Sequence, residues 1–304
     1  MDAESNLFIP GRVPHCERRG PGTGYRNLWD DGNLLPEVLR PGDATVLVVT
    51  AGTGDPLFLN ALLGENLPML AFPCPVVIEA CEGPGRASVY WEDAIAPEHV
   101  SDEALQAESE QLLYSHAGED EPHAEKRRWQ REIRCIRMAR DSRLLRGGLR
   151  LILLTGGAWN IIKQYAAIAP LADAVVIAGP GMRALDALGQ RFLSGCLYGA
   201  CRRDVFFVMD QPGFEQDARR EMIGHYLAPV FAGKGGMVDG ALYDRRVFFM
   251  DSRAGIHGQT GSQHFLPTAH GGPEMRPVTA PDMQAFKTEL YRVLRPRRRL
   301  KAGA

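Results

Sequence analysis

Short runs of apolar residues recur along this chain, and longer segments of mixed polarity separate them. The runs are rich in Val, Ile, Leu and Phe and are bounded by Gly or Pro, which is typical of strands buried on both faces of a sheet. Seven runs have this pattern, at 44–52, 74–82, 87–93, 149–157, 172–180, 204–211 and 246–252. Continuous apolar strands of this kind favour a mainly parallel sheet.

The segments between the runs carry apolar residues at helical spacing. In 122–142, Trp129, Ile133 and Ile136 share one helical face, and the opposite face is basic. The predicted helices are 101–114, 122–142, 158–168, 183–197, 214–231 and 281–294. Strands that alternate with helices predict an α/β fold, with a doubly wound, mainly parallel sheet and helices on both faces.

Composition agrees with one globular domain. The chain of 304 residues divides most simply into an N-terminal arm at 1–25, a domain at 26–295 and a basic tail at 296–304. A formal net charge of -2 gives no reason to expect nucleic acid. No apolar run reaches the length of a membrane span, and the acidic start lacks the layout of a secretory signal, so we expect a cytoplasmic protein.

Neither the cysteines nor the histidines form a recognisable metal site. No CxxC pair occurs and no cysteine has a histidine at ligand spacing, so most of the thiols are predicted to be small buried groups. His257, His264 and His270 lie in a Gly-rich stretch without a carboxylate at short spacing, which favours a polar loop over a metal site. The six cysteines are Cys16, Cys74, Cys81, Cys135, Cys196 and Cys201.

Two basic segments offer candidate contacts with anionic lipid. One is the polar face of the predicted helix 122–142, and the other is the tail RPRRRLKAGA. A solvated helix face and a soluble end account for both segments without a partner. The cations of the predicted helix are Lys126, Arg127, Arg128, Arg131, Arg134, Arg137 and Arg140.

The stretch VLVVTAGTGDPLFLNALLGENLP, at 46–68, predicts a strand, a glycine-rich turn and a helix, which is the usual framework of a phosphate site. Backbone N–H groups of Gly52, Thr53 and Gly54 can bind an anion at the helix start. A Walker loop, GxxxxGK[ST], adds a lysine for the outer phosphates and a hydroxyl for magnesium. Asp55 and Pro56 occupy those two positions here.

The acid at position 55 opposes the binding of a nucleotide. Two like unit charges about 4 Å apart repel by roughly 4 kcal/mol at an effective dielectric constant near 20, and the missing lysine forfeits a similar amount. Asp followed by Pro is a strong helix start, because the carboxylate caps free N–H groups and proline fits the next position. We therefore predict that Asp55 itself occupies the phosphate site.

A dinucleotide site is an alternative for the same turn. Gly52 and Gly54 begin a GxGxxG pattern, and Glu79 ends the next apolar run, where an acid would bind a ribose. Leu57 replaces the third glycine, and the extended connection at 72–75 differs from the direct helix-to-strand path of that fold. The partial pattern is weak evidence for this alternative.

Beyond the turn, the chain resembles the GTPase domain of the dynamin superfamily, and bacterial dynamin-like proteins in particular, over about residues 25–295. FLNALLGENLP (58–68) is similar to the helix after the phosphate loop, and FPCPVVIEACEGPGRASVYWED (72–93) to switch I and its hairpin. SRLLRGGLRLILLTGGAWN (142–160) resembles the approach to switch II. The segments 172–180, 204–227 and 246–255 resemble the remaining core strands and base-recognition turns. The resemblance implies a P-loop NTPase-like fold.

The residues that would contact a nucleotide depart from the family pattern. Leu154 stands where the resemblance implies a magnesium-supporting aspartate, Gly213 stands where a guanine-pairing acid is expected, and no threonine occurs at 72–79. Phosphoryl transfer depends on positioning and electrostatics, so these losses together leave little catalysis. The vestigial nucleotide pocket comprises Gly52, Thr53, Gly54, Asp55, Thr155, Gly157, Asp210, Ser252 and Arg253.

The resemblance then implies a non-catalytic pseudo-GTPase that acts as a regulatory or scaffold protein. The expected partner is an active dynamin-like GTPase, or a second copy bound through the same face, and we expect no catalytic residue, metal or cofactor. One alternative is a weak or atypical GTPase that binds GTP or GDP, with an arginine such as Arg253 in place of the lysine. Another is an adaptor that binds anionic membranes as a peripheral protein.

Overall fold

The structure is a computed structural model of the chain. It describes residues 44–50, 57–68, 70–72, 74–91, 96–115, 133–155, 164–165, 168–179, 204–210, 245–250, 266–267, 273–274 and 281–302. Every structural statement below concerns these residues.

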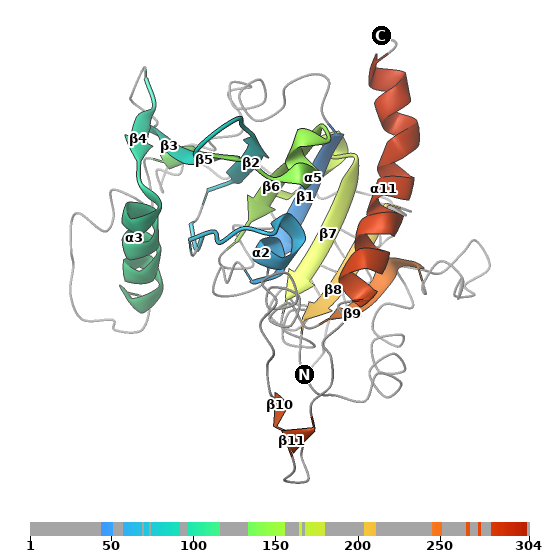
Figure 1. The fold of residues 1–304 in the computed structure, drawn as a ribbon. Helices are drawn as coiled ribbons and strands as arrows, with labels where there is room; N and C mark the ends of the chain where they lie inside the picture. Colours follow the sequence, from blue (N-terminus) through green and yellow to red (C-terminus); the bar gives the residue numbers. More distant parts are fainter. Residues whose placement is uncertain are drawn as a thin grey trace, which may run out of the picture.

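A nine-stranded sheet forms the centre of the described fold, with strand order β4-β3-β5-β2-β6-β1-β7-β8-β9 (Figure 1). Its strands are β1 (Ala44–Thr50), β2 (Val76–Ala80), β3 (Arg86–Trp91), β4 (Glu98–Val100), β5 (Ile133–Arg140), β6 (Leu149–Leu154), β7 (Ala174–Gly179), β8 (Val205–Asp210) and β9 (Val247–Met250). A separate two-stranded sheet pairs β10 (Leu266–Pro267) with β11 (Pro273–Glu274). All seven strands predicted from apolar runs are confirmed.

The sheet is mixed, so the predicted mainly parallel arrangement holds only for part of it. The block β6-β1-β7-β8-β9 is parallel throughout. On its other side, β2 runs antiparallel to β6, β5 is parallel to β2, and β3 and β4 alternate in direction. The chain reverses direction across the short connections 81–85, between β2 and β3, and 141–148, between β5 and β6. In both cases one further strand lies between the two strands that the connection joins.

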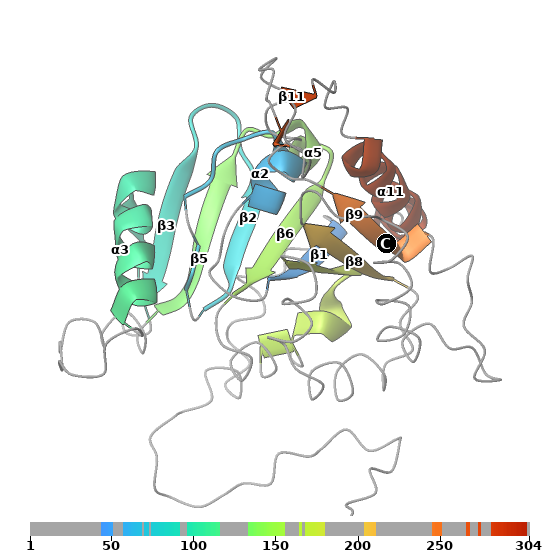
Figure 2. The same cartoon turned by 90° about the horizontal axis from the view of Figure 1, so that it is seen from below.

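Three helices lie together on one face of the sheet, as Figures 1 and 2 show. They are α2 (Leu57–Leu63), α5 (Arg143–Arg146) and α11 (Pro281–Ala302). Helix α3 (Asp102–Ser115) lies beside β3, and the short helix η1 (Ala169–Leu171) precedes β7. Every residue of β1 and of β6 is buried, so both faces of the sheet are covered there. This two-sided burial explains why those strands are apolar with little polar alternation.

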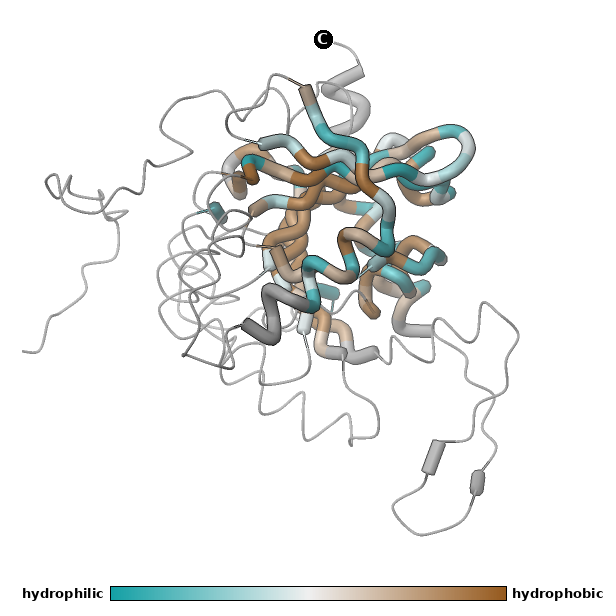
Figure 3. Tube along the Cα trace, turned by 90° about the vertical axis from the view of Figure 1, so that its left-hand side faces the viewer, coloured by the Kyte–Doolittle hydropathy of each residue, from teal (hydrophilic) through white to brown (hydrophobic). Residues whose placement is uncertain are grey.

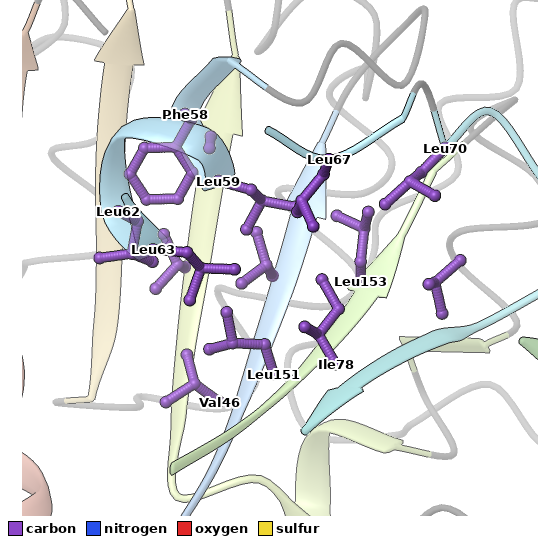
Figure 4. Packing of buried hydrophobic residues seen from close by; sticks show 14 of the residues in the cluster. Val46, Phe58, Leu59, Leu62, Leu63, Leu67, Leu70, Ile78, Leu151 and Leu153 are labelled. Atoms are coloured by element: carbon purple, nitrogen blue, oxygen red, sulfur yellow. The ribbon is translucent and has the colours of Figure 1, made fainter. Parts of the chain in front are cut away.

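The core lies between the sheet and these three helices. Figure 3 shows the hydrophobic segments gathered at the centre of the described fold, with hydrophilic segments around them. Side chains of α2, including Phe58 and Leu62, lie over Val46 of β1 and Leu151 of β6 (Figure 4). Six of the seven residues of α2 are buried, so this short helix is enclosed by its neighbours rather than stabilised by its own propensity.

The predicted helix at 122–142 is wrong where the structure describes it, because 133–140 is the strand β5. The register between β3 and β5 shifts at Tyr90 and Trp91. The buried residues of β5 are Ile133, Cys135, Ile136, Met138 and Arg140. The irregularity places Ile133 and Ile136 on the same buried side, which imitates helical spacing. Residues 122–132 lie outside the described ones.

The arginines of this segment do not form a basic helical face either. Arg137 donates to both carboxylate oxygens of Glu79 at 2.8 Å, and Arg140 pairs with Asp102 at 2.6 Å. Arg140 is 4% exposed, so its charge is neutralised inside the fold and is not presented to solvent. These two cations are unavailable to a lipid surface.

The other predicted helices differ in outcome. Segments 101–114 and 281–294 are confirmed as α3 and α11. Helix α11 continues to Ala302, so most of the predicted basic tail is helical, which agrees with the high helix propensity of Arg, Leu, Lys and Ala. Only fragments of 158–168 are described, and 183–197 and 214–231 lie outside the described residues.

An aromatic cluster anchors α11 to the sheet and to α2. The ring of Phe286 meets those of Phe58, Phe206 and Phe248 edge to face, with centroids 5.7, 5.7 and 5.4 Å away. Near the amino end of β9, Arg246 donates to Glu289, which also accepts from Arg292 at 2.6 and 2.7 Å. One apolar and one charged contact therefore hold the helix.

We expect Phe286→Ala to lower the free energy of unfolding by about 3–5 kcal/mol, because a fully buried ring with three aromatic neighbours leaves a large cavity. Urea denaturation at neutral pH measures the change. Gln284→Ala, at an exposed position of the same helix, is the matched control and should change it little. Equal effects of the two variants would contradict the packing described for α11.

The Arg246–Glu289 contact predicts a pH dependence of stability. Partial burial opposes ionisation of Glu289, but hydrogen bonds from Arg292 and Arg246 outweigh it and lower the pKa of this carboxyl. Glu289→Gln should lower the free energy of unfolding at pH 7 by roughly 1–3 kcal/mol. The difference from wild type should shrink as the pH falls below about 4.3, where the carboxyl of the unfolded chain is protonated, and should be lost once the pH has passed through the lower pKa of the folded protein. Urea titrations at several pH values would contradict this if the difference stayed constant down to pH 3.

Candidate functional site at the carboxyl edge of the sheet

The carboxyl ends of the five parallel strands lie side by side along one edge of the sheet. Val49 pairs with Leu154, Thr50 with Ala178, and Asp210 with Met250. Segments that leave these strands therefore start next to one another, including 51–56 after β1. In open α/β sheets, ligands bind beyond the carboxyl ends of the strands, so this edge is the candidate site.

The structure describes two of the nine predicted pocket residues. Thr155 follows β6 directly, and Asp210 ends β8, so both lie at the carboxyl edge. The structure thus brings the starting points of the predicted segments together. Gly52, Thr53, Gly54, Asp55, Gly157, Ser252 and Arg253 lie outside the described residues.

Leu154 ends β6 and is completely buried. Its neighbour on β1 is Val49, which is equally buried. An apolar side chain at this point offers no oxygen to a metal or to a metal-bound water. The strand end is therefore built as part of the core.

The hydroxyl of Thr155 bonds to the main chain of the connection between α2 and β2. Its Oγ1 lies 2.8 Å from the carbonyl oxygen of Leu70 and 3.0 Å from that of Phe72. A hydroxyl has one proton, so the two carbonyls share this donor. Thr155 is 1% exposed, and its hydroxyl is used within the protein.

A second hydroxyl holds the same connection from the other side. Ser109 of α3 is fully buried, and its Oγ accepts from the backbone N–H of Ala71 at 2.8 Å. Asn60 of α2 accepts from the backbone N–H of Leu67 at 2.8 Å. The segment 70–72 is thus bonded to β6 and α3, and we call it the pinned connection. Sequence reasoning missed Ser109, because nothing local marks a contact 38 residues away.

The end of the pinned connection and the residues that follow it pack into the core. Phe72 is fully buried, Cys74 is 4% exposed, and β2 begins two residues later. Burial raises the pKa of the Cys74 thiol well above its usual value, which makes it unreactive. Cys74 and Cys135 are buried thiols, as predicted for most cysteines, whereas Cys81 is partly exposed.

Thr50, the last residue of β1, carries a polar atom with no evident role. Its Oγ1 is buried and has no hydrogen-bond partner among the described residues. Thr50 is 8% exposed and lies where the chain enters the segment 51–56. A buried hydroxyl without a partner costs free energy, so it marks a point that an additional polar group would stabilise.

The ribose-binding role that the dinucleotide alternative gives Glu79 is wrong, because Glu79 lies at the opposite edge. Strand β2 is antiparallel to β6, with Ile78 opposite Leu151, so Glu79 comes next to the amino end of β6. Both oxygens of its carboxylate accept from Arg137, and Nε of Arg150 lies 3.8 Å from Oε2 of Glu79. A ribose bound near 51–56 is out of reach of this acid.

The described residues hold neither a metal-binding cluster nor a membrane-spanning helix. Among them, no group of three His, Cys, Asp or Glu side chains is placed to bind a metal ion. No helix in the described part of the chain has the length and apolar character needed to cross a membrane.

Comparison with known structures identifies the architecture. The chain matches no protein-family model, and no curated protein matches it. Solved structures do match, including a bacterial dynamin from an oligomerised pair described as sensing and tethering membranes over long range, at a TM-score of 0.53 and 13% identity. The fold is dynamin-like.

The match covers most of this chain but only part of the dynamins. It includes 90% of this chain and 49% of that bacterial dynamin, and in a second structure of the pair it includes 89% and 40%, again at a TM-score of 0.53. The chain therefore spans about half the length of these dynamins or less. At 13% identity the similarity establishes the dynamin-like fold alone.

We expect Thr155→Val to lower the free energy of unfolding by about 1–3 kcal/mol, because two buried carbonyl groups lose their shared donor. Amide hydrogen exchange in a peptide covering 70–76 should become faster. Thr155→Ser keeps the donor and is the matched control, with slow exchange. Unchanged exchange in the valine variant would show that the pinned connection does not depend on this hydroxyl.

Proposed function

We propose that this chain is a non-catalytic, dynamin-like pseudo-GTPase that acts as a regulatory or scaffold partner. The observation that carries the proposal is the pinned connection. It leads directly into the segment 72–93 that resembles switch I and its hairpin, and both Thr155 and Ser109 hold it in the core. A segment that responds to a γ-phosphate has to reorganise when the nucleotide changes, and this one is bonded on two sides.

The chemistry of the edge supports the same proposal. Leu154 is buried where the family resemblance implies an acid, and Asp55 stands where it implies a lysine. One change removes metal support, and the other reverses the charge that faces the phosphates. The metal-supporting acid and the phosphate-binding lysine act together in phosphoryl transfer, so the loss of both favours a domain that does not hydrolyse GTP.

The partner we propose is a related dynamin-like GTPase, which binds at the carboxyl edge. The bacterial dynamins with the same architecture are described as an oligomerised pair. A second copy of this chain is the other occupant of the same surface. A regulatory or scaffold protein of this kind needs no catalytic pocket, because it acts by binding its partner through a rigid surface.

We expect no heat of binding when GTP or GDP with Mg²⁺ is titrated into the protein in a calorimeter. Asp55 repels the γ-phosphate, and the lysine that would attract it is absent. Each effect makes the free energy of binding less favourable by roughly 4 kcal/mol, the energy of two unit charges about 4 Å apart at an effective dielectric constant near 20. Asp55→Lys combined with Pro56→Ser restores the two Walker residues and is the informative comparison. Micromolar binding by the wild-type protein would overturn the proposal.

The partner role needs a separate measurement. GTP turnover by a dynamin-like GTPase of the same genome should change when this chain is added in stoichiometric amount, and sedimentation should show a mixed complex. Sedimentation of the chain alone tests self-association. A chain that stays monomeric and leaves turnover unchanged would remove the scaffold role while leaving the nucleotide result intact.

Thr50 favours a second candidate, a weak or atypical GTP-binding protein. Its buried hydroxyl lacks a hydrogen-bond partner among the described residues and lies at the end of β1, where a bound nucleotide would supply one. If a nucleotide binds there, Thr50→Val and Gly54→Val should both weaken it. If nothing binds, Thr50→Val should leave stability unchanged or raise it, because the variant removes an unsatisfied polar group.

A further inference from the structure

Three residues on one face of α3 hold this helix to the rest of the protein. Asp102, Leu105 and Ser109 are spaced by three and four residues, so they lie on the same side of the helix. Leu105 and Ser109 are completely buried, whereas the other side chains at 102–110 are partly or fully exposed. Figures 1 and 2 show α3 at the side of the sheet that carries β3 and β4, away from α2, α5 and α11. Over 102–110, one apolar side chain and polar contacts therefore hold the helix.

An ion pair fixes the first turn of α3. Nη2 of Arg140, at the end of β5, donates to Oδ1 of Asp102 at 2.6 Å. Nε of Arg140 lies 4.0 Å from Oε2 of Glu65, two residues beyond the end of α2. A Cβ at Gly85 would lie 2.5 Å from Nη1 of Arg140, so the turn between β2 and β3 packs directly against the guanidinium. Arg140 thus joins the start of α3 to the segment that leaves α2.

The second polar contact lies two turns further along the helix. Ser109 is seven residues beyond Asp102, which corresponds to about 10 Å along the axis. Its Oγ accepts from the backbone N–H of Ala71 in the pinned connection. Helix α3 is therefore attached near both ends of the path from α2 to β2, at Glu65 through Arg140 and at Ala71 directly.

The sheet and α3 differ in how firmly they are held. Every residue of β1 and β6 is buried, whereas Leu105 is the one residue at 102–110 in the hydrophobic core. A helix of 14 residues is marginal on its own in water, so α3 depends on its docking contacts. Segments with few buried apolar contacts open at a lower free energy than the core. Helix α3 is therefore placed to undock while the sheet stays folded.

We propose that α3 is a detachable strap, whose docking through Asp102 and Ser109 determines whether the pinned connection is fixed. With α3 docked, the connection is bonded on two sides, by Ser109 and by Thr155. With α3 undocked, Ala71 loses its acceptor and only the bonds from Thr155 remain. This regulation rests on the proposed function in one respect, because the fixed connection is the state in which the carboxyl edge binds a GTPase partner.

Hydrogen exchange of the full chain, without nucleotide or partner, tests the strap itself. Asp102→Ala should speed exchange about tenfold in peptides covering 102–112 and 70–76, because α3 loses a hydrogen bond between charged groups. Peptides covering 44–50 and 149–154 should keep their wild-type rates. Asp102→Asn keeps an acceptor oxygen without the charge, so it should give the same pattern with a smaller increase.

Glu103→Ala is the matched control, because it removes the same charge from the same turn at an exposed position. It should leave exchange at 70–76 within about twofold of wild type. Faster exchange at 102–112 alone in Asp102→Ala would show that the helix frays without releasing Ala71, and would overturn the proposal. Equal acceleration at 44–50 would show global unfolding in place of local undocking, and would overturn it as well.

Exchange in the presence of a GTPase partner separates the strap from the proposed function. A partner that binds only the docked state suppresses undocking, so a saturating dynamin-like GTPase of the same genome should slow exchange at both 70–76 and 102–112. Slower exchange at 70–76 alone would indicate a contact footprint and would contradict regulation by α3. Absence of any binding would remove the proposed function and the regulatory role together, whereas the exchange of the chain alone would still decide whether α3 is a strap.

Discussion

The burial of the parallel strands on both faces is the constraint on which the rest of the structure depends. Strands β1 and β6 lie at the centre of the sheet, and all of their residues are buried. Such strands leave no side chain free for chemistry along their length, so polar groups can act only where a strand ends. The order β6-β1-β7-β8-β9 brings five of these ends to one edge.

That edge lacks, at Leu154, the acid that the family resemblance implies. In a GTPase, an acid follows the strand that precedes switch II, and the switch segments reorganise when the nucleotide changes. Here the strand ends in Leu154, and the next residue bonds to the pinned connection. The same hydrogen bonds that stabilise the domain restrict the motion on which a nucleotide switch depends. A stable edge of this kind suits a binding partner better than a catalyst.

Much of the sheet could be predicted from the sequence, because two-sided burial leaves a local signature. The run at 44–52 is apolar apart from Thr45 and Thr50, and the strand β1 occupies most of it. Strand β5 escaped prediction because its register shift imitates helical spacing and its arginines resemble a solvated face. The direction of β2 also could not be read, since the composition of a run does not record which way it pairs. The dinucleotide alternative therefore needed Glu79 at the carboxyl edge, whereas it lies next to the amino end of β6.

The candidate site was predictable only where the chain keeps a linear motif. The segment 51–56 stands out because a strand, glycines and a helix follow one another. The bonds from Ser109 to Ala71 and from Thr155 to Phe72 join residues 38 and 83 positions apart. Contacts at such separations follow from tertiary packing, and a hydroxyl in a sequence gives no sign of its acceptor.

The path of α11 links the two edges of the sheet. The helix crosses the sheet from near α2 to the amino ends of β6 and β9, held by Phe286 in the middle and Glu289 further along. Leu294 is its last residue in the hydrophobic core, so the core contacts of α11 end at the edge opposite the carboxyl ends of the parallel strands.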